Sequence, residues 1–414
     1  MKEILKTEFD KIVQNSNFSK KEIEFRKENL NKFIKEGFPT KKNENWKFSD
    51  ISQIIQNSIG ELKYYNDYYL SKKIDNLKYV SEFDHNKIIF VNGKIENIDF
   101  NFEDKNKINI SNDKKINIRS ENNSLLTLNN MFNENNCLIT IKSNYKLKRP
   151  LIIYHFINNE AKSTNINLQL NFLLEANSSL KLIDVFNDKS QKNFINIFYN
   201  FDIKKDAILK NFKVDSGENN NVQYSYNNIE QDTNSISETF ILSRGSKFIK
   251  NEINCNLKDK FSSAFINGIF SLSGENRHEI RSQINHLSEN TKSYQLIKSV
   301  MSEKSKSVYQ GKIYVDKIAQ KTDGYQLSKA ILLNDETEFN AKPELEIYAD
   351  DVKCSHGSAS GNLNENSIFY LRSRGLTYDE AKKLLIKGFL LDVIEKITDN
   401  EIKEFIKEIM GFKE

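Results

Sequence analysis

A long run of short alternating segments limits most strongly what this chain can fold into. Between Leu125 and Leu333, segments such as LIIYHFI, NINLQLNFLLE and SLKLIDVF alternate apolar with polar residues, and brief turns rich in Asn, Asp, Lys, Ser and Gly separate them. Alternation with a period of two is typical of β-strands that have one buried face. Pro150 is the only proline between Pro39 and Pro343, so backbone N–H groups are mostly available for sheet pairing. We therefore predict one long all-β region.

Composition alone leaves two all-β architectures open, a sandwich of two sheets and a stacked solenoid. Regular strand–turn repetition over about 200 residues favours the solenoid slightly, because a single sandwich is usually smaller. Asn-rich turns also suit a solenoid, since Asn tolerates the left-handed backbone of tight corners. The pair Asn92-Gly93 interrupts an apolar run and predicts a hairpin at the start of this region.

Both ends of the chain show helical spacing of apolar residues. The capping-box pattern of Ser or Thr followed three residues later by Glu occurs before apolar stripes at residues 19–22, 377–380 and 398–401. The single tryptophan, Trp46, lies in the polar segment NENWKFSD, where we expect it to anchor a linker to the main domain. The predicted domains are 1–86, mainly helical; 87–370, the β core; and 371–414, helical.

Charge and cysteine content exclude several classes of protein. The chain of 414 residues has 61 Lys and Arg against 57 Asp and Glu, a net charge of +4 with no long basic block, so nucleic acid is not an expected partner. Cys137, Cys255 and Cys354 form no C-x-x-C pair, which predicts neither a disulfide framework nor a self-contained zinc site. No run of about 18 apolar residues occurs. We expect a cytoplasmic protein without a membrane anchor.

The segment from Pro343 to Gly375 holds the strongest candidate ligands, Cys354 and His356. If residues 345–356 form one continuous strand, these two side chains share the face opposite Leu345, and a rise of two residues separates their Cα atoms by roughly 6.5 to 7 Å. Both could then reach a common metal. The alternative is structural, with a small buried cysteine and a histidine in a turn, because a four-coordinate site needs more than two ligands.

The same segment carries a family resemblance. KPELEIYADDVKCSHG followed by FYLRSRGL resembles the SufB/SufD family, the scaffold subunits of the bacterial Suf machinery for iron-sulfur cluster assembly. VYQGKIYV, AQKTDGYQLSKAILL and, near the N-terminus, GFPTKKNENWKFSDI are similar to further elements of this family. The matching motifs span about Gly37 to Gly375 in the family's order. The Asn- and Lys-rich segment from about 97 to 250 matches only in its pattern.

The resemblance implies a fold and a set of partners. The fold is a mainly β, right-handed parallel β-helix with helical N-terminal and C-terminal segments. The function is that of a SufD-like scaffold subunit, which assembles iron-sulfur clusters with SufB and the SufC ATPase and passes them to apoproteins. SufB would bind the C-terminal part of the β-helix and SufC the C-terminal helical domain; an isolated chain could form a homodimer.

The resemblance also assigns roles to single residues. The histidine of the K-C-S-H-G element acts at the SufB–SufD interface, which gives His356, with Cys354 beside it, the expected catalytic and metal-binding role toward a nascent cluster shared with SufB. Gly357 stands where SufB has glutamate, so the chain resembles the SufD side of the family. A reduced flavin is associated with such complexes, although the sequence shows no flavin motif.

Two other functions stay open. One is a purely structural subunit, in which SufB performs all cluster chemistry and His356 only packs. The other is a carbohydrate-binding β-helix protein, which the lack of a signal peptide and of exposed carboxylate pairs disfavours. The chain lacks G-x-x-x-x-G-K-[ST], so we do not expect it to bind ATP by a P-loop. The resemblance implies a scaffold subunit that works with the SufC ATPase and is not a freestanding enzyme. His278 and His286 have no metal-ligand spacing and are expected to pack as ordinary residues.

Overall fold

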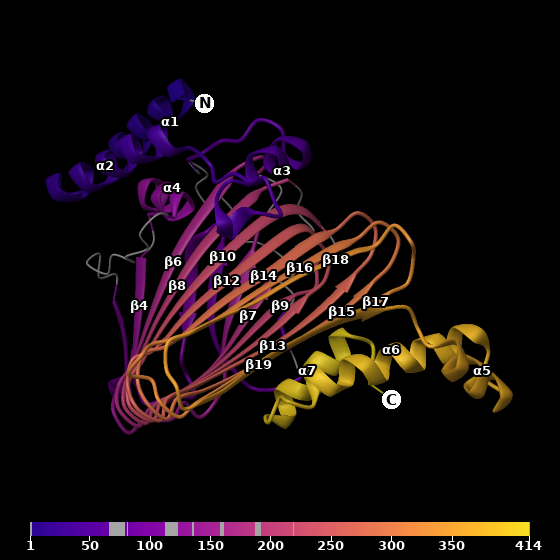
Figure 1. The fold of residues 1–414 in the computed structure, drawn as a ribbon. Coiled ribbons are helices and arrows are strands. Elements are labelled where there is room, and N and C mark those ends of the chain that lie inside the picture. The colour runs from indigo at the N-terminus through magenta and orange to yellow at the C-terminus, as the bar shows by residue number, and fades with distance from the viewer. Residues whose placement is uncertain are drawn as a thin grey trace.

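The chain winds alternately through two long sheets, and helices lie at both ends of the molecule (Figure 1). The computed structural model describes residues 2–65, 79–80, 82–111, 123–134, 136–157, 161–186, 192–217 and 219–413. The first sheet contains β1 (Asn86–Val91), β2 (Lys94–Asp99), β5 (Leu151–Phe156), β7 (Ser179–Phe186), β9 (Ile208–Asp215), β11 (Ile236–Ser243), β13 (Ser263–Leu272), β15 (Lys292–Met301), β17 (Thr322–Leu332) and β19 (Val352–Gly361). The second contains β3 (Ile108–Ser111), β4 (Asn136–Ile141), β6 (Asn165–Leu174), β8 (Phe194–Ile203), β10 (Asn219–Gln231), β12 (Ser246–Leu257), β14 (Arg277–His286), β16 (Lys306–Val315) and β18 (Glu338–Ile347).

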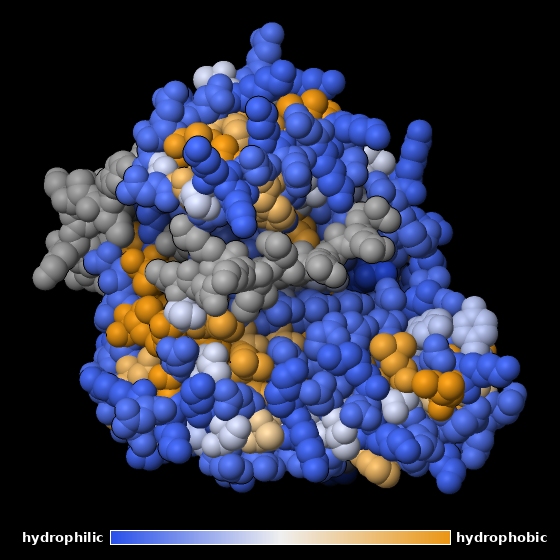
Figure 2. Space-filling view, turned by 90° about the vertical axis from the view of Figure 1, so that its left-hand side faces the viewer, coloured by the Kyte–Doolittle hydropathy of each residue, from blue (hydrophilic) through white to orange (hydrophobic). Residues whose placement is uncertain are grey.

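Each turn of the solenoid places one strand in each sheet. Strands of successive turns pair in parallel, as in Phe265 with Tyr294 and Tyr294 with Tyr325. The inward faces of both sheets meet in a continuous apolar core that includes Leu170, Ile253 and Cys255. The prediction of a parallel β-helix with helical ends is therefore confirmed. Most of the face shown in Figure 2 is hydrophilic, as expected when the apolar side chains of the strands point inward.

Asparagine residues form many of the corners between strands. Asn144, Asn177, Asn234 and Asn290 have φ between 56° and 60°, in the left-handed region that Asn tolerates better than other residues with a side chain. The corners of successive turns also bond to one another; the Asn177 side-chain amide donates to Asn144 Oδ1 over 3.0 Å. The Asn-rich composition of this region thus follows from the solenoid geometry.

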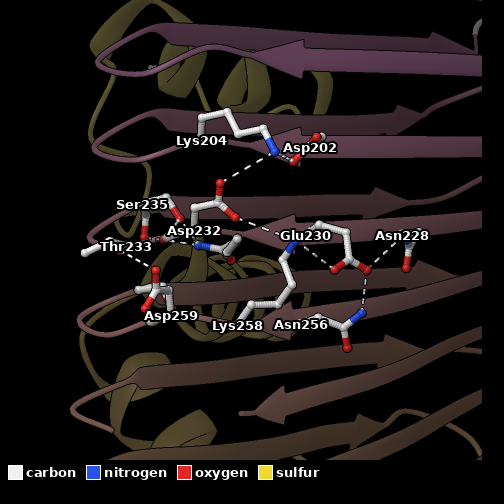
Figure 3. A network of polar contacts seen from close by, with 12 residues as sticks. Asp202, Lys204, Asn228, Glu230, Asp232, Thr233, Ser235, Asn256, Lys258 and Asp259 are labelled. Carbon is white, nitrogen blue, oxygen red and sulfur yellow. Dashed lines mark hydrogen bonds and ion pairs between the residues drawn. The ribbon is translucent and has the colours of Figure 1, made fainter. Parts of the chain in front are cut away.

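Stacked charges reinforce one column of corners (Figure 3). Lys204 lies 2.8 Å from Asp202 of its own turn and 3.5 Å from Asp232 of the next turn. Lys258 continues the column, 3.6 Å from Asp232 and 3.4 Å from Glu230. These side chains are partly exposed, so each ion pair contributes at most about 1 kcal/mol to the free energy of unfolding. Their alternating signs favour stacking of the turns in this one register.

The two ends of the solenoid differ. At the N-terminal end, β1 pairs with β2 in an antiparallel hairpin and β3 pairs antiparallel with β4. The predicted hairpin turn is present, because Asn92 and Gly93 both have positive φ, 49° and 81°. At the C-terminal end, β18 and β19 are the last strands of their sheets. We call the free edges of β18 and β19 the open end.

Helices of the N-terminal segment lie on the outer face of the second sheet. They are α1 (Lys2–Asn15), α2 (Lys20–Glu36), the 3-10 helix η1 (Glu44–Trp46) and α3 (Ile51–Ser58); a second 3-10 helix, η2 (Lys105–Lys107), precedes β3. Ser19 and Glu22 form the predicted capping box of α2. Trp46 is buried, its ring 5.5 Å from that of Tyr224 and 4.6 Å from Lys250 Nζ. The prediction that it anchors the linker is confirmed.

A helix inside the predicted all-β region was missed. Residues Ser124–Phe132 form α4, which packs between α2 and the second sheet. Nearly all of its residues are buried, so it has no polar face to produce helical periodicity in the sequence. Its short apolar run looks like that of a buried strand.

Three C-terminal helices complete the fold: α5 (Glu365–Ser373), α6 (Tyr378–Ile394) and α7 (Asn400–Ile409). The second half of α6 and α7 cover the outer face of the first sheet, where Leu390 and Phe405 join the apolar cluster of Phe240 and Leu296. Thr377 caps α6 with Glu380 as predicted. The predicted box at residues 398–401 is wrong, because Asp399 caps α7.

The division into three domains stays a prediction. Helix α5 begins at Glu365, before the proposed boundary at residue 370, and the proposed N-terminal domain includes residues 66–78 and 81, outside the described part of the chain. Among the described helices, none combines the length and apolar character that a membrane span requires.

Candidate functional site

Cys354 and His356 lie on β19, the last strand of the first sheet. Being two residues apart, they share one face of the strand, as predicted. In register with them on β17 are Gly324 and Gln326. Cys354 is half-buried and His356 is exposed.

The prediction of one continuous strand over residues 345–356 is wrong. β18 ends at Ile347 and β19 begins at Val352 in the opposite sheet, because the solenoid turns a corner between them. That corner stacks on the previous one, with the Lys321 amide donating to the Asp351 carbonyl over 2.5 Å. Leu345 and Cys354 therefore do not lie on opposite faces; both pack on one cluster that contains Ile313.

Cys354 thus faces the interior of the last turn. A Cβ atom at Gly324 would lie 3.3 Å from Cys354 Sγ and 3.4 Å from Ile313 Cγ2, so the glycine leaves the space that the thiol occupies. Burial raises the pKa of the Cys354 thiol above its ordinary value, and the nearby Asp323 carboxylate raises it further. A thiol with a raised pKa is mainly protonated at neutral pH, so it binds iron only with loss of its proton.

A layer of buried polar side chains lies beside His356. Gln326 is fully buried, and its side-chain amide donates to the Glu344 carbonyl of β18 over 3.3 Å. The Tyr309 hydroxyl lies 3.4 Å from Gln326 Oε1. Any Cβ at Gly311 would collide with both Gln326 and the Tyr309 hydroxyl. Gly311, the glycine of VYQGKIYV, thus leaves the space that Gln326 and Tyr309 occupy. Gln326 belongs to β17, the strand next to His356.

This support was missed by the sequence reading, although its residues lie in the motifs VYQGKIYV and DGYQLSKAILL. A glycine or a glutamine at an inward position of a strand is the sequence signal that could have indicated this polar layer. Gln326 sits at an inward position where an apolar residue is expected. That exception to the pattern distinguishes β17, the strand that pairs with β19.

The site is incomplete within one chain. In the described part of the molecule, no three His, Cys, Asp or Glu side chains are grouped closely enough to hold a metal ion. A thiolate and an imidazole are both known ligands of iron-sulfur clusters, but two ligands do not enclose one. His356 lies exposed at the open end, where another molecule can reach it.

Two further cysteines and two histidines are buried in the core: Cys137, Cys255, His278 and His286. Burial raises the pKa of Cys137 to about 11 and of Cys255 to about 12. His278 Nε2 donates to the Ser246 carbonyl over 2.7 Å, and Nδ1 of the neutral ring accepts from the Ser243 hydroxyl over 2.9 Å; burial lowers the pKa of His278 to about 4. His286 is likewise buried, and its pKa falls to about 3. The prediction that His278 and His286 pack as ordinary residues is confirmed, since both lie in the core.

A second exposed surface lies at the tip of the C-terminal helices. Figure 1 shows α5 and the start of α6 extending away from the sheets. Phe369 is 73% exposed, Tyr370 56%, Tyr378 46% and Leu384 48%. At the end of α5, Gly375 has a φ of 98°, which lets the chain turn sharply before α6. Large apolar side chains gathered at one tip are typical of a protein-docking surface.

Comparisons with known proteins agree with the motifs. Residues 156–389, more than half of the chain, match the family model described as "SUF system FeS cluster assembly, SufBD core domain". The chain is 24% identical to the iron-sulfur cluster assembly protein SufD of Escherichia coli over 93% of its own length and 91% of that protein. It is also 45% identical over 74 residues to the chloroplastic protein ABCI7 of Arabidopsis thaliana, which covers 18% of this chain and 16% of that protein. The chain therefore belongs to the SufBD family of iron-sulfur cluster assembly proteins.

Proposed function

We propose that this chain is the SufD-like half of a scaffold that it completes with a SufB-type subunit and a SufC-type ATPase. The observation that supports this most strongly is the open end, where two strand edges and two soft metal ligands occur together. Its role would be to position groups for cluster assembly, and iron and sulfide would be its cargo.

The strand edges favour pairing with a partner. Natural solenoids and sheets usually cover or interrupt their edge strands, because free N–H and C=O groups recruit other chains. Here the edge strands of the N-terminal end, β2 and β3, are short and run antiparallel to their neighbours, whereas β19 presents ten residues without a proline. β18 includes Pro343, which has no N–H to offer. We therefore expect β19 to form most of the backbone contacts with the SufB-type subunit.

The chemistry of the site needs that partner. His356 can coordinate iron or move a proton, since each ring nitrogen of an imidazole can carry a proton or bind a metal. Cys354 can supply a thiolate once its proton has left. The partner would provide the additional ligands at the same interface. The sequence has no strand followed by G-x-G-x-x-G, so we assign no flavin site to this chain and no step to a flavin.

The exposed tip of α5 and α6 is the proposed contact for the ATPase. The chain has no P-loop, so nucleotide hydrolysis in the complex must occur on another subunit. Phe369 and Leu384 offer apolar side chains that such a subunit could bury. A purified chain should hydrolyse no ATP, and activity should arise only when the SufC-type subunit is added.

Hydrogen exchange tests the pairing. The chain is compared alone and co-purified with candidate SufB-type and SufC-type subunits. Amides of residues 352–361 that do not bond to β17 should exchange rapidly in the isolated chain and slowly in the complex. Amides in central strands such as β13 serve as the control and should not change. Unchanged exchange over 338–347 and 352–361 in a stable complex would place the interface elsewhere.

Point variants test the ATPase contact better than a truncation does. Deletion after Leu376 would expose the apolar face that α6 and α7 cover, and would disturb the fold itself. The double variant Phe369→Ser, Leu384→Ser changes only exposed side chains and should abolish SufC binding. The exposed Phe261→Ser variant, on a solenoid corner, is the matched control. Normal SufC binding by the double variant would refute this contact.

A further inference from the structure

A cavity of about 580 Å³ lies between the linker after α2 and the outer face of the second sheet. Its walls include Glu36 at the end of α2, linker residues between Phe38 and Trp46, and the N-terminus of α4. The floor consists of side chains from β10, β12 and β14, among them Tyr226, Glu252 and Arg281. A volume of this size is within the range of pockets that hold small organic molecules.

Glu252 is a buried carboxylate at this cavity. The residue is 1% exposed, yet its Oε1 atom has no hydrogen-bond partner among the described residues. Its nearest cation is Arg281, whose Nη1 lies 3.7 Å from Oε2, an ion pair too long for a hydrogen bond. The other terminal nitrogen of Arg281, Nη2, donates to Gln283 Oε1 over 3.1 Å. A buried charged oxygen without a donor is costly, so the cavity favours an occupant with N–H groups.

The remaining lining adds charge and flat apolar surface. Glu36 and Glu44 bring the number of carboxylates to three, against the single guanidinium of Arg281. Glu44 pairs with Lys342 of β18, which leaves Glu36 and Glu252 facing one arginine. Phe38 and Trp46 also line the cavity and provide aromatic surface. A cation with a planar group matches both properties.

We propose that this cavity binds a small organic cation whose planar amidinium or guanidinium group donates hydrogen bonds to Glu252. Two parallel N–H groups match the two oxygens of a carboxylate, which gives both strength and orientation. The rest of the ligand would lie between the linker and the sheet. Because the linker forms one wall, an occupant would also hold the N-terminal segment against the solenoid. The proposal does not depend on the cluster-assembly function.

Benzamidine is a suitable probe, and benzamide is its neutral analogue of nearly the same shape. Calorimetric titration of the full chain should show benzamidine binding at least tenfold more tightly than benzamide. Glu252→Gln should abolish that preference, whereas Glu238→Gln on the outer face of the other sheet should keep it. Both variants are checked by thermal melting.

Equal binding of benzamidine and benzamide by the unaltered chain, or no binding of either, would overturn the proposal and leave the cavity as a water-filled space. The same conclusion follows if a folded Glu252→Gln variant keeps the full preference for benzamidine. The comparison of the two probes on the unaltered chain remains decisive even if Glu252→Gln does not fold.

Discussion

At the scale of single residues, small side chains determine the geometry of the candidate site. Gly324 leaves room for Cys354 Sγ, and Gly311 leaves room for Gln326 and the Tyr309 hydroxyl. Neither glycine has a positive φ, so close packing rather than backbone conformation explains them. The position of Cys354 thus depends on the absence of a Cβ atom at Gly324 of β17. The support of the strand beside His356 depends in the same way on Gly311 of β16.

Gly311→Ala should destabilise the chain, because the added methyl group must displace Gln326 or Tyr309. Overpacking of this kind costs about 1 to 3 kcal/mol in the free energy of unfolding. Gly361→Ala is the matched control, since a Cβ there meets nothing within 4 Å. Urea denaturation of both variants measures the difference. Equal stability of the two variants would show that the polar layer beside His356 adjusts freely.

The buried histidines predict a pH dependence. Burial lowers the pKa of His278 to about 4, so the unfolded chain, with a pKa near 6.5, takes up the proton first as pH falls. The stability that neutral His278 contributes is present above about pH 6.5 and is lost between there and about pH 4. At pH 5 the loss should be about 2 kcal/mol relative to pH 7.5.

Denaturation of the parent and of His278→Gln at pH 7.5 and pH 5 measures this loss. Stability should fall less steeply with pH in His278→Gln, because glutamine binds no proton. An identical pH dependence in both proteins would mean that His278 is protonated in the folded state.

At the scale of elements, the sequence predicts the type of most elements but not their place in space. Period-two alternation identifies strands such as β6, and Ser19 with Glu22 identifies the start of α2. Helix α4 was missed because it is buried on all sides. The break between β18 and β19 was missed because Leu345, Ile347 and Ala349 keep a period of two past the end of β18, and only the stacking of turns reveals the corner.

A buried ion pair lies beneath the contact between the N-terminal linker and the solenoid. Lys250 Nζ lies 2.8 Å from Glu279 Oε2, with both side chains almost fully buried, and Glu279 also bonds to Ser49 of the linker. Removal of one partner leaves a buried charge uncompensated, which typically lowers the free energy of unfolding by about 3 to 5 kcal/mol. Arg277, 3.2 Å from Glu279, compensates part of this loss.

Lys250→Met should therefore destabilise the chain by about 3 kcal/mol. It should also loosen the linker, and Trp46, the only tryptophan, reports this directly through a red shift of its fluorescence. The exposed Lys306→Met variant, which breaks a surface pair with Glu338, should change stability by less than about 0.5 kcal/mol. An unshifted Trp46 fluorescence spectrum in Lys250→Met would show that the linker stays docked without this ion pair.

At the scale of the whole molecule, the two ends of the solenoid differ. The N-terminal end finishes in short antiparallel strands, and the open end finishes in long parallel strands that carry Cys354 and His356. The motifs identified the family and these two residues. They could not reveal that the pair lies at the free edge of a sheet, because that depends on which turn of the solenoid is last.

The central claim is that the open end contributes His356 to a cluster-assembly site shared with a SufB-type subunit. Anaerobic reconstitution of the complex, with iron and sulfide counted, tests it in the parent, His356→Ala and the same-strand control Ser360→Ala. Both residues are exposed, so each variant should melt near the parent and still form the complex, with stability changed by no more than about 0.5 kcal/mol. The account predicts that iron and sulfide fall sharply in His356→Ala alone. Full cluster yield on a normally assembled His356→Ala complex would contradict it and make this chain a purely structural subunit.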